Sequence, residues 1–311
     1  MSTHLIGKEH AFGTFSAAHP PALTVRPGAG DLVTFETDDL AYAQMEELRD
    51  LGKVTATINP VTGPLLVEGA EPGDALAVHI HDIELAPSGW SVSIPGAGAL
   101  AEVMGPEFMV RRIPVSDGRV RLTDTLDCAV APMLGCIGLA PADGEASSVM
   151  PSYRSGGNMD LTDARPGSTV LLPVQVPGAL LSIGDIHAVM ARGESSFVAI
   201  EIAGRATVSV DLLKGVDLRA PQVDTGDEWV CVGLGDPVQD SIVMAYESLH
   251  AVMLEHGWSR DDAYVVLSAL GHTELGGPTG SVTPDPLHPF RPVGAVTLAR
   301  IAQDVLHHPS R

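Results

Sequence analysis

Short apolar runs separated by glycine and proline dominate the chain as far as residue 235. Residues 75–85 show the pattern most clearly, because Leu76, Val78 and Ile80 alternate with polar positions and so share one face of an extended segment. Such alternation favours strands rather than helices. The same pattern predicts strands at 31–37, 64–67, 108–113, 119–122, 169–176, 197–202 and 207–213.

Helical periodicity is found early, at residues 40–51, and then again towards the C-terminus. Residues 240–255 place apolar side chains at three- and four-residue spacing, and Ser259 is a suitable N-cap for a second helix. The predicted helices of this C-terminal part are 240–255, 260–270 and about 294–306.

The predicted fold class is therefore α+β and β-rich, a sheet- or barrel-like body of short strands with a C-terminal helical hairpin. We expect residues 1–235 to form the body that carries the candidate site. Residues 236–311 are expected to form a helical part packed on it as one compact unit. Two Gly-rich segments are predicted as loops, namely 86–110 and 271–277.

Charge and composition narrow the classes of partner. The 311 residues carry a formal net charge of −21, and such a surface repels nucleic acid and anionic membranes. No apolar run reaches the length of about 18 residues that a membrane span needs. The cysteines have no CxxC spacing, and the N-terminal residues lack an apolar signal core. Free thiols and a cytoplasmic location are expected.

Polar residues with metal-binding or acid–base chemistry gather at the ends of apolar runs between residues 156 and 201. Asp185 and His187 are two positions apart, so an extended strand would point both to the same face. A carboxylate and an imidazole that converge can hold a divalent cation. A second reading makes Gly184-Asp185 a turn and His187 a buried structural histidine.

Two longer segments make the pattern specific. The first reads GGNMD at 156–160, LPV at 172–174, GALLSIGDIHA at 178–188 and GE at 193–194. The second reads NPVTGPLLVEGAEPGD at 59–74. Together they resemble the acetamidase/formamidase family, and the likeness extends from about Pro21 to about Leu270. The resemblance implies hydrolysis of a short amide, acetamide or formamide, to a carboxylate and ammonia. It also implies a divalent metal and a homodimer or higher homo-oligomer.

Amide hydrolysis needs a nucleophile, stabilisation of the oxyanion and a proton for the leaving nitrogen. The GxSxG motif of α/β-hydrolases is absent, and no lysine lies in the setting that lysine-dependent amidases need. Water activated by a metal is the design that the residues support, because bound zinc lowers the pKa of its water to about 7. Zinc is the expected metal, with calcium as the alternative.

The candidate residues divide into three groups by their chemistry. The expected metal ligands are Asp160, Asp185 and His187, and the expected catalytic carboxylates, one of them the general base, are Glu194 and Glu201. Contacts to substrate or to the ligands are expected from Asp39, Asn158 and Gly157. Asp39 has a second interpretation, as the N-cap of the helix at 40–51.

Two other functions stay open at this point. The first is a non-catalytic β-rich protein that binds a small amide or a metal, although four acids in one region exceed what binding needs. The second is hydrolysis of a larger or cyclic amide, in a pocket whose size residues 86–110 would set. The roles of four further residues stay undecided: His79, His81, His272 and Glu274.

Overall fold

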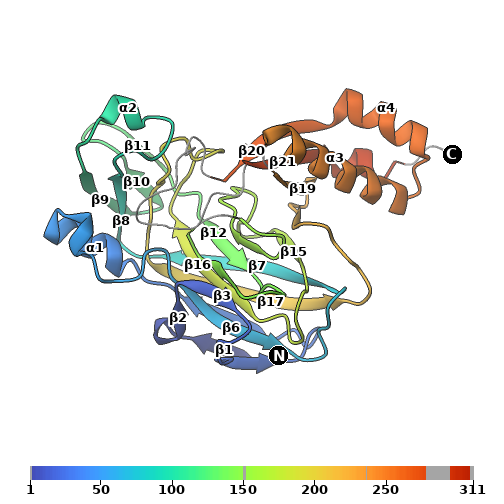
Figure 1. The fold of residues 1–311 in the computed structure, drawn as a ribbon, viewed down its shortest axis with the longest axis horizontal. Helices are drawn as coiled ribbons and strands as arrows, with labels where there is room; N and C mark the ends of the chain where they lie inside the picture. The colour runs from blue at the N-terminus through green and yellow to red at the C-terminus, as the bar shows by residue number, and fades with distance from the viewer. Residues whose placement is uncertain (1, 150–151, 236, 278–294, 309–311) are drawn as a thin grey trace.

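Two β-sheets packed against each other form the centre of the protein (Figure 1). The structure is a computed structural model that describes residues 2–149, 152–235, 237–277 and 295–308. In these ranges neither sheet closes into a barrel, and the protein is β-rich with a helical C-terminal part, as predicted. No described helix is long and apolar enough to cross a membrane.

The larger sheet contains nine of the described strands, in the order β1, β5, β17, β7, β15, β18, β19, β21 and β20. Its longest strands, β7 (Ala75–Leu85) and β17 (Gly204–Leu213), pair antiparallel along their whole length with one register shift. The others are β1 (Thr3–Ile6), β5 (Leu32–Glu36), β15 (Thr169–Pro173), β18 (Gln222–Asp224), β19 (Glu228–Gly235), β20 (His272–Gly276) and β21 (Ala295–Ala302).

The second sheet positions most of the candidate site. Its order is β14, β12, β16, β6 and β2, with β4 parallel to β6. The strands are β2 (Ala11–Phe12), β4 (Leu23–Val25), β6 (Val61–Val67), β12 (Met133–Gly138), β14 (Gly156–Asn158) and β16 (Leu181–His187). A separate pair joins β3 (Thr14–Ser16) to β13 (Glu145–Ser147).

One apolar core joins the two sheets. The larger sheet contributes Phe35 and Val78, and the second sheet contributes Leu134 and Ile183, all of them fully buried. Burying an aliphatic or aromatic side chain of this size stabilises the fold by about 1.5–3 kcal/mol. Because β16 lies between β12 and β6 over this core, its C-terminal end is held firmly in place.

A four-stranded sheet lies beside the second sheet, next to helix α1 (Figure 1). Its strands are β8 (Ser88–Ser93), β9 (Met109–Ser116), β10 (Arg119–Arg121) and β11 (Asp127–Ala129), and the nearby helices are α1 (Leu40–Leu48), α2 (Ala101–Met104) and η2 (Leu51–Lys53). The short helix η1 (Lys8–His10) instead contacts β6 of the second sheet. Tyr42, Trp90 and Phe197 belong to a second apolar cluster in this region.

The C-terminal helices cover one end of the larger sheet. Helix α3 (Val238–Glu255) packs on β19 and β21, and α4 (Arg260–Leu270) packs on α3. Ser259 caps α4 as predicted, because its hydroxyl accepts a hydrogen bond from the amide of Asp262 at 3.1 Å. A last short helix is α5 (Gln303–Leu306).

Four predicted segments are wrong. Residues 86–110 contain β8 and α2 rather than one long loop, and 197–202 form no strand beyond a bridge at Glu201. Residues 271–277 contain β20 instead of a loop. The last predicted helix corresponds to β21 followed by α5, with Gly294 outside the described residues. In each missed strand the pairing partner is distant in sequence, so local pattern gives little sign of it.

Candidate active site

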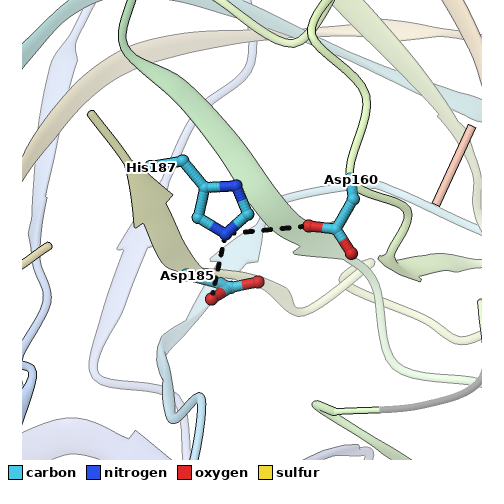
Figure 2. A group of neighbouring side chains, drawn as sticks. All are labelled: Asp160, Asp185 and His187. Atoms are coloured by element: carbon cyan, nitrogen blue, oxygen red, sulfur yellow. Dashed lines mark ion pairs between the residues drawn. The ribbon is translucent and has the colours of Figure 1, made fainter. Parts of the chain in front are cut away.

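The C-terminal end of β16 carries the first two candidate ligands. Asp185 Oδ1 lies 3.5 Å from His187 Nε2, so the two side chains converge as the Asp-x-His spacing predicts. Figure 2 shows both side chains turned towards Asp160. His187 is 1% exposed, so this end of the strand is sealed from bulk water.

Asp160 reaches the same point from the turn that follows β14. Its Oδ1 lies 3.9 Å from His187 Nε2 (Figure 2). The backbone amide of Asp160 donates to the carbonyl of Gly135 at 3.1 Å, and Asn158 Nδ2 donates to Asp160 Oδ2 at 2.9 Å. The GGNMD segment thus brings one acid to the site and fixes it through Asn158.

The two candidate catalytic carboxylates complete the group. Glu201 Oε2 lies 3.1 Å from His187 Nε2, and its other oxygen accepts a hydrogen bond from the amide of Ala199 at 3.1 Å. Glu194 is 6% exposed, and one of its oxygens lies within 4.8 Å of ligand atoms of His187 and Glu201. The Glu194 side chain makes no hydrogen bond or ion pair with any residue that the structure describes.

Several buried polar atoms in this group have no hydrogen-bond partner among the described residues. They are Asp160 Oδ1, Asp185 Oδ1, Asn158 Oδ1, and both ring nitrogens of His187. The close approaches to His187 Nε2 therefore lack hydrogen-bond alignment. Leaving such an atom unpaired costs about 1–3 kcal/mol. Oxygen and nitrogen donors that converge without partners fit a divalent cation, so the residues present match the expected metal.

Three of the acids sit on unusual backbone. Asp160, Asp185 and Glu194 have φ angles of 47°, 56° and 35°, in the left-handed region that residues other than glycine seldom adopt. Residues in this region persist only where the surroundings impose it, and they concentrate at functional sites. The fold therefore accepts backbone strain at the positions that direct these carboxylates inward.

The acids shift one another's protonation. Burial, and then the charge of Asp185, raises the pKa of Asp160 to about 7, while burial and then Glu201 raise that of Asp185 to about 7. Burial and the charge of Asp160 raise the pKa of Glu194 well above its usual range. Burial alone would lower the pKa of His187. The negative charges of Glu201 and Asp185 outweigh the effect of burial, so that the pKa of His187 is raised. A cation among these groups would favour the carboxylate forms.

Asp39 and Gly157 lie around the group rather than within it. The indole Nε1 of Trp90 donates to Asp39 Oδ2 at 2.8 Å, and the backbone of Trp90 pairs with that of Glu201. Asp39 occupies the N-cap position of α1, and its carbonyl accepts a hydrogen bond from the amide of Ala43, but its side chain makes no cap hydrogen bond. Gly157 packs its backbone against Gly138 of β12.

The four undecided residues have ordinary protein partners or lie exposed. His79 bonds to Thr169 and Asp211, and His81 bonds to Ser209, across strands of the larger sheet. His272 is exposed at the start of β20. Glu274 pairs with two arginines, Arg192 and Arg300.

Sequence reasoning missed two residues of the site. A Cβ atom at Gly135 would lie 2.5 Å from carboxylate oxygens of both Asp160 and Asp185, so only glycine fits there. Tyr42 is buried, and its hydroxyl donates to Asn59 Oδ1 at 2.7 Å. Burial, and then the charge of Glu201, raises the pKa of Tyr42, which keeps the phenol protonated. Gly135 interrupts the apolar run of β12, and a glycine inside a strand is a signal of close backbone packing. The helical pattern around Tyr42 offered no such signal.

The chain is similar in sequence to several known proteins. A sequence model of the Acetamidase/Formamidase family matches residues 8–144 and 115–271. A formamidase candidate from Schizosaccharomyces pombe is 30% identical over 250 residues, which cover 60% of each chain. An acetamidase from Mycolicibacterium smegmatis is 28% identical over 260 residues, 63% of this chain and 64% of that protein. The chain thus spans less than two thirds of the length of these relatives.

A solved structure extends the likeness over nearly the whole chain. It is the crystal structure of an acetamidase/formamidase, assigned by prediction, from Thermoanaerobacter tengcongensis. The two chains are 28% identical, with a TM-score of 0.86 and 98% of each chain covered.

Proposed function

Because the chain belongs to the acetamidase/formamidase family, we propose that it hydrolyses a short aliphatic amide, acetamide or formamide, to the carboxylate and ammonia. The observation that carries the proposal is the buried group of four acids and one histidine. A protein that only binds a small amide has no need of an acid such as Glu194, which is buried and has no described partner.

We propose that Asp160, Asp185 and His187 hold the cation, since their unpartnered atoms face one another. Zinc is the proposed ion, because a histidine nitrogen is one of the three donors. Calcium is the alternative, because oxygen donors outnumber nitrogen donors. When bound, a divalent ion polarises the amide oxygen and lowers the pKa of a water molecule.

Glu194 is the proposed general base. Its carboxylate is buried beside the ligands yet engaged with no described residue, so it is free to exchange a proton with substrate. Hydrolysis forms a bond from the water oxygen to the amide carbon and breaks the carbon–nitrogen bond. Glu194 would accept the proton of the water and then donate it to the departing nitrogen.

Glu201 is better suited to positioning than to proton transfer. One oxygen lies near His187 Nε2, and the other is bonded to the amide of Ala199. The backbone of Glu201 also pairs with that of Trp90, whose backbone amide donates to the Glu201 carbonyl at 2.7 Å. These contacts hold Glu201 in one place, where it orients the imidazole of His187.

The substrate class is tested by ammonia release from formamide, acetamide, propionamide and a small lactam. We expect turnover of the short linear amides and its loss in Asp185→Ala, with an exposed-site variant, Glu68→Gln, as the active control. Turnover of the lactam alone would favour the cyclic-amide function. Amide binding without ammonia from any substrate would favour a binding protein. Assembly as a homo-oligomer and a cytoplasmic location stay predictions.

A further inference from the structure

A chain of ion pairs connects the C-terminal strands to both loops that carry site acids. Arg300 of β21 is 2% exposed, and its guanidinium lies 2.5 Å from Asp163 Oδ2 and 3.1 Å from Glu274 Oε2. Glu274 of β20 also pairs with Arg192, whose guanidinium lies 3.6 Å from Asp163. Among the described residues, Glu228 of β19 is a further partner of Arg300, at 2.7 Å.

Arg192 lies in the turn that presents Glu194. The amide of Glu194 donates to the carbonyl of Ala191 at 3.1 Å, which closes a four-residue turn with Arg192 and Gly193 at its centre. Gly193 has φ 80° and Glu194 has φ 35°. The Arg192 side chain thus extends from the same tight turn that carries Glu194.

Asp163 lies three positions after Asp160 in the loop that follows β14. It is 3% exposed and sits between Arg300 and Arg192. Asp163 thus pairs both with Arg192 of the Glu194 turn and with Arg300 of β21, and so joins the Asp160 loop to each of them.

The Arg300–Asp163 and Arg192–Glu274 ion pairs differ in solvent exposure, which indicates different roles. Arg300 and Asp163 are both buried, so their contact belongs to the core of the fold. The side chains of Arg192 and Glu274 are 44% and 31% exposed, and ion pairs this exposed add little to stability. The Arg192–Glu274 pair is therefore better explained by the position it gives to the Glu194 turn than by a contribution to the stability of the fold.

We propose that Arg192 and Glu274 are positioning residues, through which the β20–β21 hairpin sets the direction of the Glu194 carboxylate. The inference rests on the proposed function only in treating Glu194 as the catalytic base. It gives Glu274 a role and makes the C-terminal hairpin part of the active-site architecture. A misplacement of about 1 Å in a catalytic group can reduce turnover about 100-fold.

The test is a mutant cycle with kcat, KM and metal content measured on each protein. We expect Arg192→Gln and Glu274→Gln each to lower kcat about 5- to 100-fold, with KM and metal content close to wild type. Arg192→Lys should recover part of the rate. In a Glu194→Gln background, Arg192→Gln should cause no further loss, because it acts through Glu194. Arg26→Gln, which breaks the exposed pair with Glu68, is the matched control.

A second measurement does not depend on turnover. Amide hydrogen exchange over residues 189–200 should become faster in Arg192→Gln and Glu274→Gln, and stay unchanged in Arg26→Gln. If the protein releases no ammonia, the proposed function fails. The exchange measurement would still show whether Arg192 and Glu274 position the Glu194 turn. Unchanged exchange in that segment, or an undiminished kcat in both variants, would overturn the inference.

Discussion

Gly135 of β12 lies directly against the carboxylate of Asp160, so that a Cβ atom at position 135 would be 2.5 Å from Asp160 Oδ1. The same Cβ would be equally close to an oxygen of Asp185. The absence of a side chain at Gly135 is therefore what allows two acids from separate segments to converge on His187.

Gly135→Ala should consequently damage the cation site while the fold survives. Both carboxylates would have to move, and we expect metal affinity to fall by about 10- to 100-fold, as for other changes around metal ligands. Isothermal titration of metal-stripped protein with zinc measures the affinity. Gly52→Ala is the control, because its Cβ would come no closer than 3.4 Å to a neighbouring atom. Equal affinities in the two variants would contradict this role for Gly135.

Cys136 is the neighbour of Gly135, but its thiol is predicted to take no part in catalysis. Burial, and then the charge of Asp185, raises the pKa of the Cys136 thiol well above its usual range, and the thiol donates to the carbonyl of Ser148. Cys136→Ala should keep most of kcat and lose about 1–2 kcal/mol of unfolding free energy, the cost of a small cavity. Urea unfolding and ammonia release on one preparation check both. A folded variant without turnover would instead indicate a cysteine nucleophile.

Protons should compete with the cation for the carboxylates of Asp160 and Asp185. The folded-state pKa values of Asp160 and Asp185 are raised from 3.8 to about 7, so the folded, cation-free protein holds these protons more tightly than the unfolded chain. That contribution to stability is present below about pH 4 and is lost as pH rises through about 7. Metal affinity should change in the opposite direction, because the carboxylate form binds the cation.

Thermal unfolding with and without zinc measures this competition. The rise in Tm caused by zinc should be small at about pH 5.5 and large at about pH 8. Asp185→Asn should weaken the pH dependence, since one of the two competing protons is gone. A zinc-induced rise in Tm that is equal at both pH values, or larger at the lower one, would argue against cation binding by these two carboxyls.

Glu194→Gln and Glu201→Gln should fail in different ways. Glutamine keeps the shape of glutamate but cannot accept the proton, so Glu194→Gln should keep its metal while kcat falls about 10²- to 10⁴-fold. Glu201 orients His187, so Glu201→Gln should lose metal affinity and activity together. Metal content and kcat on the same preparations separate the two. If Glu194→Gln keeps wild-type kcat, Glu201 becomes the candidate base.

Much of the fold and part of the site could be predicted from local pattern. Strand 75–85 and helix 260–270 were predicted with the bounds observed, because alternation and a Ser N-cap are local signals. Asp185 and His187 were found through their spacing on one strand. Strand β21 was missed because its Ala-rich sequence suits a helix, and only pairing with β19 and β20 makes it a strand.

The parts of the site that escaped prediction depend on contacts between distant segments. Gly135 matters because it meets Asp160 and Asp185 in space, and Tyr42 because α1 brings it near the acids. The partners of Glu274 are likewise far away in sequence. Residue type and spacing suggest which side chains can do chemistry, but only the packed sheets decide which of them meet.

The central claim is that amide hydrolysis depends on a cation held by Asp160, Asp185 and His187. Ammonia release from acetamide, measured on one preparation before chelation, after removal of metal and after stoichiometric zinc is returned, tests it most directly. We predict full activity, then none, then recovery, with no recovery in His187→Ala. Undiminished ammonia release from rigorously metal-free protein would contradict the account.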